Sequence, residues 1–308
     1  TQTSRGLGDV YKRQGYFHFL EIYLSQNKNM ISSLDHIILA VEDLKDAEKN
    51  YKNILGIEPS WRGLHKELGT ANVIFNFKNT YLELLSAEGE GVGADLVKES
   101  IKKNGEGLAG IVLNTKDISR ASKRLKDLGF LVGDVLTGEG KNKDTNDTRN
   151  WKYLFLPQEL TRNLFLFLIE HTKGILPQDE KFPPGSINKL DHVVINTNDA
   201  DGFINIYQDI FNIRLALDRI IEHWKSRMLF FRLNKTTIEV IEKKDRKDPN
   251  DSLWGLAWEV ESIKDAHERL VSKGVEVTEI KKGLKENTLV ATIKSHTHNV
   301  PTLLIEHT

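Results

Sequence analysis

A histidine and a glutamate recur in this chain at one spacing, and together they could bind a divalent metal ion. His36 stands 47 residues before Glu83, and His192 stands 47 residues before Glu239. Both glutamates lie inside apolar segments, where a carboxylate is rare without a partner. Imidazole and carboxylate groups are common ligands of divalent ions. The spacing therefore predicts a metal site in at least one half of the chain, although inherited structural histidines would give the same pattern.

A second repeated segment adds two glutamates to this set. Residues 168–172 and 304–308 both read LIEHT, and they contribute Glu170 and Glu306. The Leu-Asp-His segments are 156 residues apart but the LIEHT segments only 136, so the second copy has lost 20 residues. Loops absorb such losses. The chain therefore contains a duplicated unit, although exposure at a strand end would also explain Glu170 and Glu306.

The residues between these motifs predict four modules, each with a strand, a short helix and several further strands. Four capping residues each precede apolar positions at helical spacing, namely Asp43, Asp117, Asp199 and Ser262. Short apolar runs of β type lie between the helices, at residues 73–77, 152–156, 228–233 and 289–293. The expected organisation is an extension over 1–32, a first domain over 33–172, a linker over 173–189 and a second domain over 190–308.

The extension differs from the rest of the chain. Its opening, TQTSRGLGDVYKRQ, has no apolar period and resembles translated linker sequence, so we expect Met30 to be the natural start. A flexible N-terminal arm is the alternative.

Composition narrows the range of functions. A length of 308 residues suits two domains of about 150 residues each. Lys and Arg number 43 against 44 Asp and Glu, so the net charge of −1 disfavours nucleic acid or anionic lipid as a partner. With 0 Cys, any metal must be bound by His, Asp or Glu. No apolar run reaches the ~20 residues of a membrane span, and we expect a cytoplasmic protein.

The paired modules, each pair opened by Leu-Asp-His, resemble the vicinal oxygen chelate superfamily. That superfamily includes glyoxalase I, extradiol dioxygenases, methylmalonyl-CoA epimerase and the bleomycin-resistance proteins. The first half also resembles glyoxalase-like domains with an H…GT-N…YLEL pattern, here His65, Gly69-Thr70-Ala71-Asn72 and residues 81–84. The resemblance covers about residues 33–308 and implies an α+β fold, in which four βαβββ modules pair into two half-barrel domains.

The resemblance also implies a metal site in each half. The family's ligand positions correspond to His36, Glu83 and Glu170 in the first half, and to His192, Glu239 and Glu306 in the second. One imidazole and two carboxylates suit divalent Fe, Mn, Ni, Zn or Mg. The remaining family ligand, often a second histidine, falls on Gly110 and Gly255, which have no side chain to offer.

The expected function is a metal-dependent, glyoxalase-like lyase or isomerase. Its metal would chelate adjacent oxygens of a small carbonyl or hydroxy-acid substrate and stabilise an enediolate, with Glu83 or Glu239 moving the proton. The alternative is a non-catalytic binding protein of the bleomycin-resistance type, and the third reading is an extradiol-type dioxygenase. The candidate substrate-binding residues, which allow for an anionic substrate, are His65, Asn72, Arg219 and Arg227. Ordinary solvated charge is the alternative for the arginines, and the chain would be a monomer or homodimer.

Overall fold

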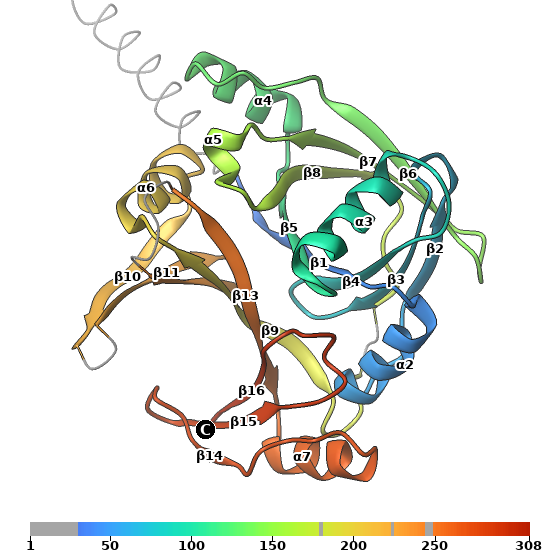
Figure 1. Cartoon of the computed structure of the whole chain (residues 1–308), viewed down its shortest axis with the longest axis vertical. Coiled ribbons are helices and arrows are strands. Elements are labelled where there is room, and N and C mark those ends of the chain that lie inside the picture. The colour runs from blue at the N-terminus through green and yellow to red at the C-terminus, as the bar shows by residue number, and fades with distance from the viewer. Residues whose placement is uncertain (1–29, 179–180, 223–224, 244–248) are drawn as a thin grey trace, which may run out of the picture.

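Two eight-stranded sheets form the body of the protein in a computed structural model (Figure 1). The structure describes residues 30–178, 181–222, 225–243 and 249–308. The segment 1–29, for which the sequence analysis expects either non-native sequence or a flexible arm, lies outside these residues. No helix within them is long and apolar enough to cross a membrane.

The first sheet follows the expected pattern of strand, helix and further strands, twice over. Its first module contains β1 (Ser33–Ala40), α2 (Leu44–Leu55), β2 (Trp61–His65), a 3₁₀ turn (Lys66–Leu68), β3 (Thr70–Asn76) and β4 (Tyr81–Ala87). After α3 (Val92–Asn104) the second contains β5 (Gly107–Asn114), α4 (Ile118–Asp127), β6 (Leu136–Asn142), β7 (Thr148–Phe155), α5 (Gln158–Thr161) and β8 (Phe165–Lys173).

The second sheet repeats the pattern with shorter connections. Its first module contains β9 (Ile187–Thr197), α6 (Ala200–Ile204), a π-helical turn (Asn205–Ile210), β10 (Arg214–Ile221), β11 (Ser226–Leu233) and β12 (Thr236–Glu242). Its second contains β13 (Asp251–Val260), α7 (Ile263–Ser272), β14 (Lys281–Lys282), β15 (Thr288–Ile293) and β16 (Thr302–His307).

The predicted helix starts are confirmed. In α2 the Asp43 carboxylate accepts from the backbone N–H groups of Lys45 and Asp46, which have no partner inside the helix. Gly56 ends this helix in the left-handed conformation, at φ 71°, which glycine adopts without a Cβ clash. The other three capping side chains likewise accept a backbone N–H, at Asp117, Asp199 and Ser262.

Paired modules of the expected α+β type are confirmed, but the two domains differ in closure. The first sheet closes into a barrel in the order β1-β4-β3-β2-β6-β7-β8-β5, whereas the second stays open in the order β10-β11-β12-β9-β13-β16-β15-β14. Pairing of Gly63 with Asn142 and of Leu64 with Lys141 joins β2 to β6. The strand before β15 is only Lys281–Lys282, and no helix corresponding to α3 is described between β12 and β13, so the residues missing from the second half come from both places.

One apolar core connects the two domains on the helix-covered faces of the sheets. It includes Phe77 from the first domain and Trp258 from the second, whose ring centroids lie 4.8 Å apart. Beside it, the buried guanidinium of Arg162 contacts Asp199 at 3.2 Å and Asp251 at 3.1 Å, both from the second domain. The opposite faces of the sheets carry the two histidine–glutamate pairs.

Candidate functional site

The predicted His36 and Glu83 pair is assembled inside the barrel of the first domain. Parallel pairing of β1 with β4 sets His36 opposite Tyr81 and Ile38 opposite Glu83, so both side chains point inward. The His36 Nε2 lies 3.4 Å from a Glu83 carboxylate oxygen. His36 is 3% exposed and Glu83 is 9% exposed.

Asp35 extends this pair into a line of four titratable groups. A register shift in β1 between Leu34 and His36 accommodates Asp35 as an extra residue on the inner face. One Asp35 oxygen lies 2.7 Å from His36 Nδ1, and the other lies 2.9 Å from His171 Nε2. Glu83, His36, Asp35 and His171 therefore form a continuous hydrogen-bonded and ion-paired line.

These contacts determine the charge states of the pair. Burial alone would raise the pKa of Glu83, but the contact with His36 and a hydrogen bond from Asn72 lower it. Asn72 donates from Nδ2 at 2.6 Å. Burial would lower the pKa of His36, but its hydrogen bonds to Asp35 and Glu83 raise it. The geometry therefore favours an imidazolium beside an ionised carboxylate, and it places the candidate Asn72 directly on Glu83.

The second domain repeats this line on its open sheet. His192 lies 2.7 Å from Asp191 and 3.4 Å from Glu239, and His307 lies 2.7 Å from Asp191. The Glu239 carboxyl differs from its counterpart, because burial raises its pKa.

One substitution between the copies contributes to that difference, beside the loss of the neighbouring His65, whose position is Ile221 in the second domain. In the first domain Asn72 stands opposite Leu85, and in the second Met228 stands opposite Ile241, at the same distance from the glutamate. A thioether therefore replaces the amide that donates to Glu83.

Glu170 and Glu306 do not join either pair, which corrects their assignment as metal ligands. Their carboxylates accept the N–H groups of Ile118 at 2.8 Å and Ile263 at 2.7 Å, where α4 and α7 begin. A helix start has unpaired N–H groups and favours negative charge. Since successive strand residues face opposite ways, the adjacent histidine of each LIEHT segment faces Asp35 or Asp191 instead.

The two candidate arginines also lie away from the histidine–glutamate pairs. Arg227 is paired with Asp218 at 2.6 Å and Asp201 at 2.7 Å, on the face covered by α6. Arg219 is exposed on the edge strand β10, which β11 and β12 separate from β9. Neither arginine is therefore placed to bind a substrate at His192.

His65, by contrast, lies inside the first barrel. Its Nδ1 is 3.1 Å from the Thr70 hydroxyl, and its ring meets Trp151 edge-on with centroids 6.2 Å apart. Burial lowers the pKa of His65, so the ring is neutral at pH 7.

The inner face of the first domain does not supply a full set of metal ligands. His36 and Glu83 provide two donors. The neighbouring positions on β5 and β8 carry no donor group and are Gly110, Val112, Phe165 and Phe167. The three-ligand site expected there is therefore not assembled.

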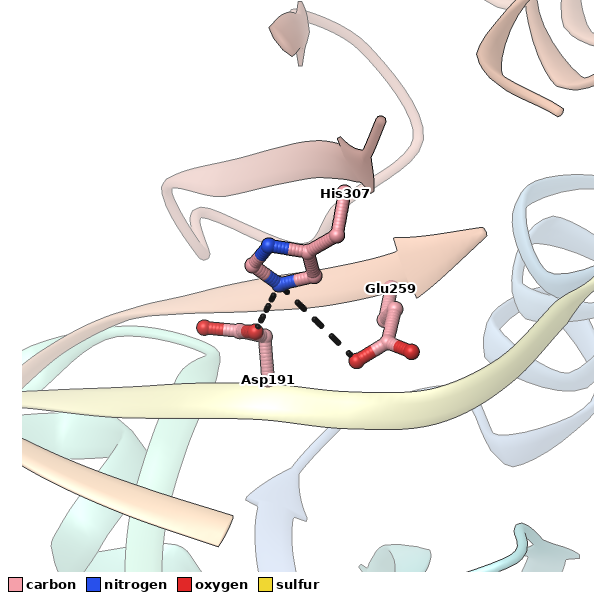
Figure 2. A group of neighbouring side chains, drawn as sticks. All are labelled: Asp191, Glu259 and His307. Carbon is pink, nitrogen blue, oxygen red and sulfur yellow. Dashed lines mark hydrogen bonds and ion pairs between the residues drawn. The ribbon is translucent and has the colours of Figure 1, made fainter. Parts of the chain in front are cut away.

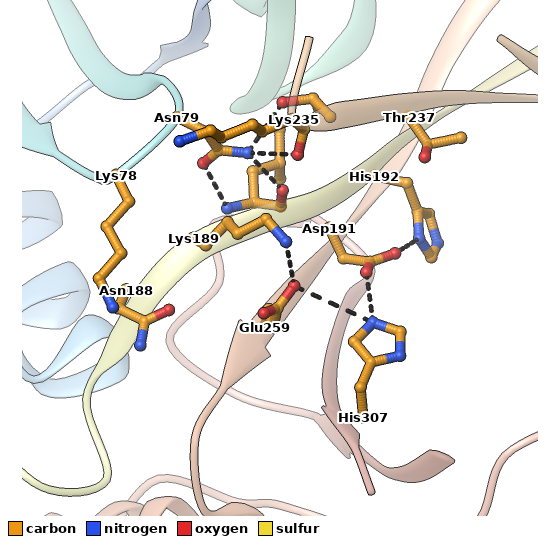
Figure 3. Close-up of polar contacts among 12 residues, drawn as sticks. Lys78, Asn79, Asn188, Lys189, Asp191, His192, Lys235, Thr237, Glu259 and His307 are labelled. Atoms are coloured by element: carbon orange, nitrogen blue, oxygen red, sulfur yellow. Dashed lines mark hydrogen bonds and ion pairs between the residues drawn. The ribbon is translucent and has the colours of Figure 1, made fainter. Parts of the chain in front are cut away.

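The second domain holds a possible metal site at residues the sequence analysis did not select. Ligand atoms of Asp191, Glu259 and His307 all lie within 4.8 Å of one another (Figure 2). Lys189 forms an ion pair with Glu259 in the same cluster (Figure 3). In the first domain Asn114 takes the position of Glu259 and donates to Asp35 at 3.0 Å. Two carboxylates and an imidazole suit a divalent ion, which would compete with the Lys189 ammonium.

Known proteins resemble the chain over both domains. Residues 34–211 match the family described as Glyoxalase-like domain, and residues 191–292 match the Glyoxalase/Bleomycin resistance protein/Dioxygenase superfamily. An ethylmalonyl-CoA/methylmalonyl-CoA epimerase from Cereibacter sphaeroides is 34% identical over 104 residues, which cover 33% of this chain and 75% of that protein.

Solved structures share the fold at low sequence identity. A mutant of 4-hydroxymandelate synthase from Streptomyces coelicolor superposes with a TM-score of 0.64 at 15% identity, covering 90% of this chain and 93% of that one. A Mn(II)-bound glyoxalase from Novosphingobium aromaticivorans gives 0.61 at 14% identity, covering 90% and 83%. The chain therefore belongs to the glyoxalase/bleomycin resistance protein/dioxygenase group, the vicinal oxygen chelate superfamily, as a two-domain member.

Proposed function

We propose that the chain is a proton-transfer enzyme of the lyase, isomerase or epimerase type, with its chemistry in the first domain. Its substrate would be a small carbonyl or hydroxy-acid compound with an acidic C–H bond. The observation that carries this proposal is the buried line Asp35–His36–Glu83, in which a carboxylate is held ionised inside a closed barrel.

Glu83 acts as the base in this mechanism. Its carboxylate takes the proton from the carbon next to the carbonyl, the C–H electron pair moves onto the carbonyl oxygen, and the proton returns on either face or to another atom. The N–H groups of His36 and Asn72 beside Glu83 can stabilise the developing oxyanion. Asp35 holds the His36 ring in orientation and supports its positive charge.

No step is assigned to a metal ion, because His36 is the only described imidazole within 4.0 Å of the reacting carboxylate and the neighbouring positions on β5 and β8 carry no donor group. The other ion site, at Asp191, Glu259 and His307, lies on a different sheet. An epimerase among the relatives supports the proton-transfer chemistry, since epimerisation next to a carbonyl removes and returns one proton.

Deuterium exchange tests the proposal directly. The full chain is incubated in D₂O with a 2-oxoaldehyde, an epimerisable acyl thioester and a 2-hydroxy acid, and ¹H NMR follows loss of the C–H signal. Glu83→Gln should lower the exchange rate at least 100-fold, as expected for loss of a general base. The matched variant Glu239→Gln should keep the exchange rate within twofold of the wild-type rate. Equal loss in both variants, or loss in Glu239→Gln alone, would contradict a catalytic first domain.

A non-catalytic binding protein is the second candidate, and an aromatic cluster supports it. Tyr153, Phe155, Phe165 and Phe167 form edge and tilted ring contacts with centroids 5.4–6.3 Å apart. Phe155 is 44% exposed, and Phe167 reaches the His36 ring at 6.2 Å. Tight binding of an aromatic ligand without any exchange, unchanged in Glu83→Gln, would favour this reading.

The dioxygenase reading gains no support from the first domain. Such an enzyme needs two histidines beside one carboxylate. Among the described residues, only His36 places an imidazole nitrogen within 4.0 Å of Glu83.

A further inference from the structure

A buried arginine without a carboxylate partner lies at one end of the first barrel. Arg149 on β7 is 6% exposed, and its Nε has no hydrogen-bond partner. Among the described residues, no carboxylate oxygen lies within 4.0 Å of its guanidinium. Its Nη2 approaches Nδ1 of His171 at 3.5 Å, which is the limit of a hydrogen bond. Its charge is therefore uncompensated by any direct ion pair.

Arg162 is the other buried arginine, and its Nε likewise has no hydrogen-bond partner, but its charge is paired with carboxylates, which sets Arg149 apart among the described residues. Arg162 is paired with Asp199 and Asp251. Arg269, which is only half-buried, donates to the backbone carbonyl oxygens of Gly185, Asn53 and Ile54. An unpaired buried charge costs several kcal/mol, and a bound anion would remove that cost.

The surroundings of Arg149 are aromatic and neutral rather than acidic. The guanidinium carbon lies 5.7 Å from the Trp61 ring centroid and 5.5 Å from that of Tyr81. Burial holds the pKa of Tyr81 well above its usual range, so the phenol stays neutral and can donate a hydrogen bond. The nearest acid on the line, Asp35, is already bonded to His36 and His171. The side chain of His171 is 25% exposed, so this end of the barrel meets solvent.

Arg149 is also connected to the proposed base through two stacked rings. Tyr81 stacks on His36 with centroids 4.4 Å apart and an interplanar angle of 13°, and His36 contacts Glu83. Arg149, Tyr81, His36 and Glu83 thus follow one another along the inner face. The corresponding strand of the second domain, β15, contains no arginine.

We propose that Arg149 is an anion-binding residue that anchors the carboxylate group of the substrate. The proposal rests on the proposed function and names its substrate class, a small carboxylic acid whose acidic C–H reaches Glu83. A planar guanidinium matches a carboxylate with two parallel N–H donors. One positive charge beside Asp35 suits a singly charged group better than a phosphate dianion.

Titration of the full chain with acetate, malonate and inorganic phosphate at constant ionic strength tests this residue. Isothermal calorimetry should show carboxylate binding that weakens at least tenfold in Arg149→Met and is unchanged in Arg227→Met, a control at a surface-paired arginine. Phosphate bound in preference to both carboxylates would overturn the carboxylate assignment. Carboxylate affinity that is absent from the wild type or unchanged in Arg149→Met would overturn the site.

Stability provides a second, independent measurement. Because Arg149 has no ion-pair partner, Arg149→Met should leave the urea midpoint of the free protein unchanged or raise it. A clear fall would show that the charge is already compensated and would count against the site. If Arg149→Met does not fold, Arg149→Lys keeps the charge without the planar fork and should bind malonate about tenfold more weakly. Wild-type affinity in Arg149→Lys would equally overturn the proposal.

This test separates the two proposals. Loss of malonate binding in Arg149→Met, together with normal deuterium exchange in Glu83→Gln, would keep the anion site and reject Glu83 as the base.

Discussion

The two copies of the histidine–glutamate pair differ in the neighbour that donates directly to the glutamate, and exchanging that neighbour should shift the pKa values of the two glutamates in opposite directions. In Asn72→Met the first domain acquires the residue found in the second, and Met228→Asn makes the opposite change. Asn72 donates to Glu83 at 2.6 Å, a short hydrogen bond to a charged acceptor in a buried site. Such bonds contribute about 1.5–3 kcal/mol, and one pKa unit corresponds to about 1.4 kcal/mol. We therefore expect the pKa of Glu83 to rise in Asn72→Met, because the ionised form loses this donor.

The sign of the effect on stability follows from the direction of this pKa shift. The pKa of Glu83 is lower in the folded than in the unfolded chain. The ionised carboxylate therefore stabilises the folded state above the unfolded pKa, and this stabilisation is lost as the pH falls through the folded pKa. Asn72→Met should thus reduce the free energy of unfolding at pH 7 by about 1.5–3 kcal/mol. The difference from the wild type should shrink as the pH falls through the folded pKa of Glu83.

Carboxyl ¹³C NMR of a chain labelled at glutamate measures both changes. Glu83→Gln and Glu239→Gln assign the two signals by their disappearance. Met228→Asn should lower the pKa of Glu239, which burial now raises. If the Glu83 midpoint moves by less than a few tenths of a unit in Asn72→Met, the hydrogen bond does not set its charge state. The argument for an ionised base would then fail.

Three further changes have defined outcomes. Arg162→Leu leaves Asp251 buried without its cation, so urea unfolding at pH 7 should show a loss of about 3–5 kcal/mol in the free energy of unfolding, with partial recovery on adding Asp251→Asn. Because burial already raises the pKa of Asp251 to about 6, this loss should grow as the pH rises above that value. A loss that does not depend on pH would contradict the ion pair. Asp35→Asn removes the anion between His36 and His171 and should lower the free energy of unfolding at pH 7 by about 3–5 kcal/mol. Because the pKa of Asp35 is held well below its usual range, this loss should diminish in acid. Equal stability of variant and wild type at every pH would refute the line of four groups. Calorimetric titration with Mn²⁺ or Zn²⁺ should show binding at least tenfold weaker in Glu259→Asn, which introduces the residue found at this position in the first domain. Binding should be tighter in Lys189→Met, where no ammonium group competes with the ion. Unchanged affinity in Glu259→Asn would exclude the cluster of Asp191, Glu259 and His307 as the ion site.

Local patterns in the sequence predicted the elements and the pairing of His36 with Glu83. Helix caps at Asp43 and Ser262 depend on neighbours within three residues, so the chain itself reveals them. The 47-residue spacing identified both pairs because the duplication preserved the strand geometry around them. The sequence analysis did not predict the helix α3, because its start at Gly91 has no capping side chain.

The side of a strand on which a residue lies was harder to predict. Glu170 and His171 are adjacent, and the sequence analysis selected the glutamate as the ligand. The structure turns that carboxylate toward the start of α4 and the histidine toward Asp35. A difference of one residue in phase reverses every side chain of a strand, and only the packing of α4 fixes the phase here.

The amino-acid sequence by itself determined the duplicated fold and the two histidine–glutamate pairs, because repeats, caps and strand periods are properties of neighbouring residues. The tertiary structure alone decided which of the remaining charges belong to the site. Arg227 is neutralised by Asp218 and Asp201, whereas Arg149 is enclosed by closure of the first barrel without any carboxylate. Both are ordinary strand arginines in the sequence, and their roles differ because compensation of a charge depends on groups that only the folded chain brings within reach.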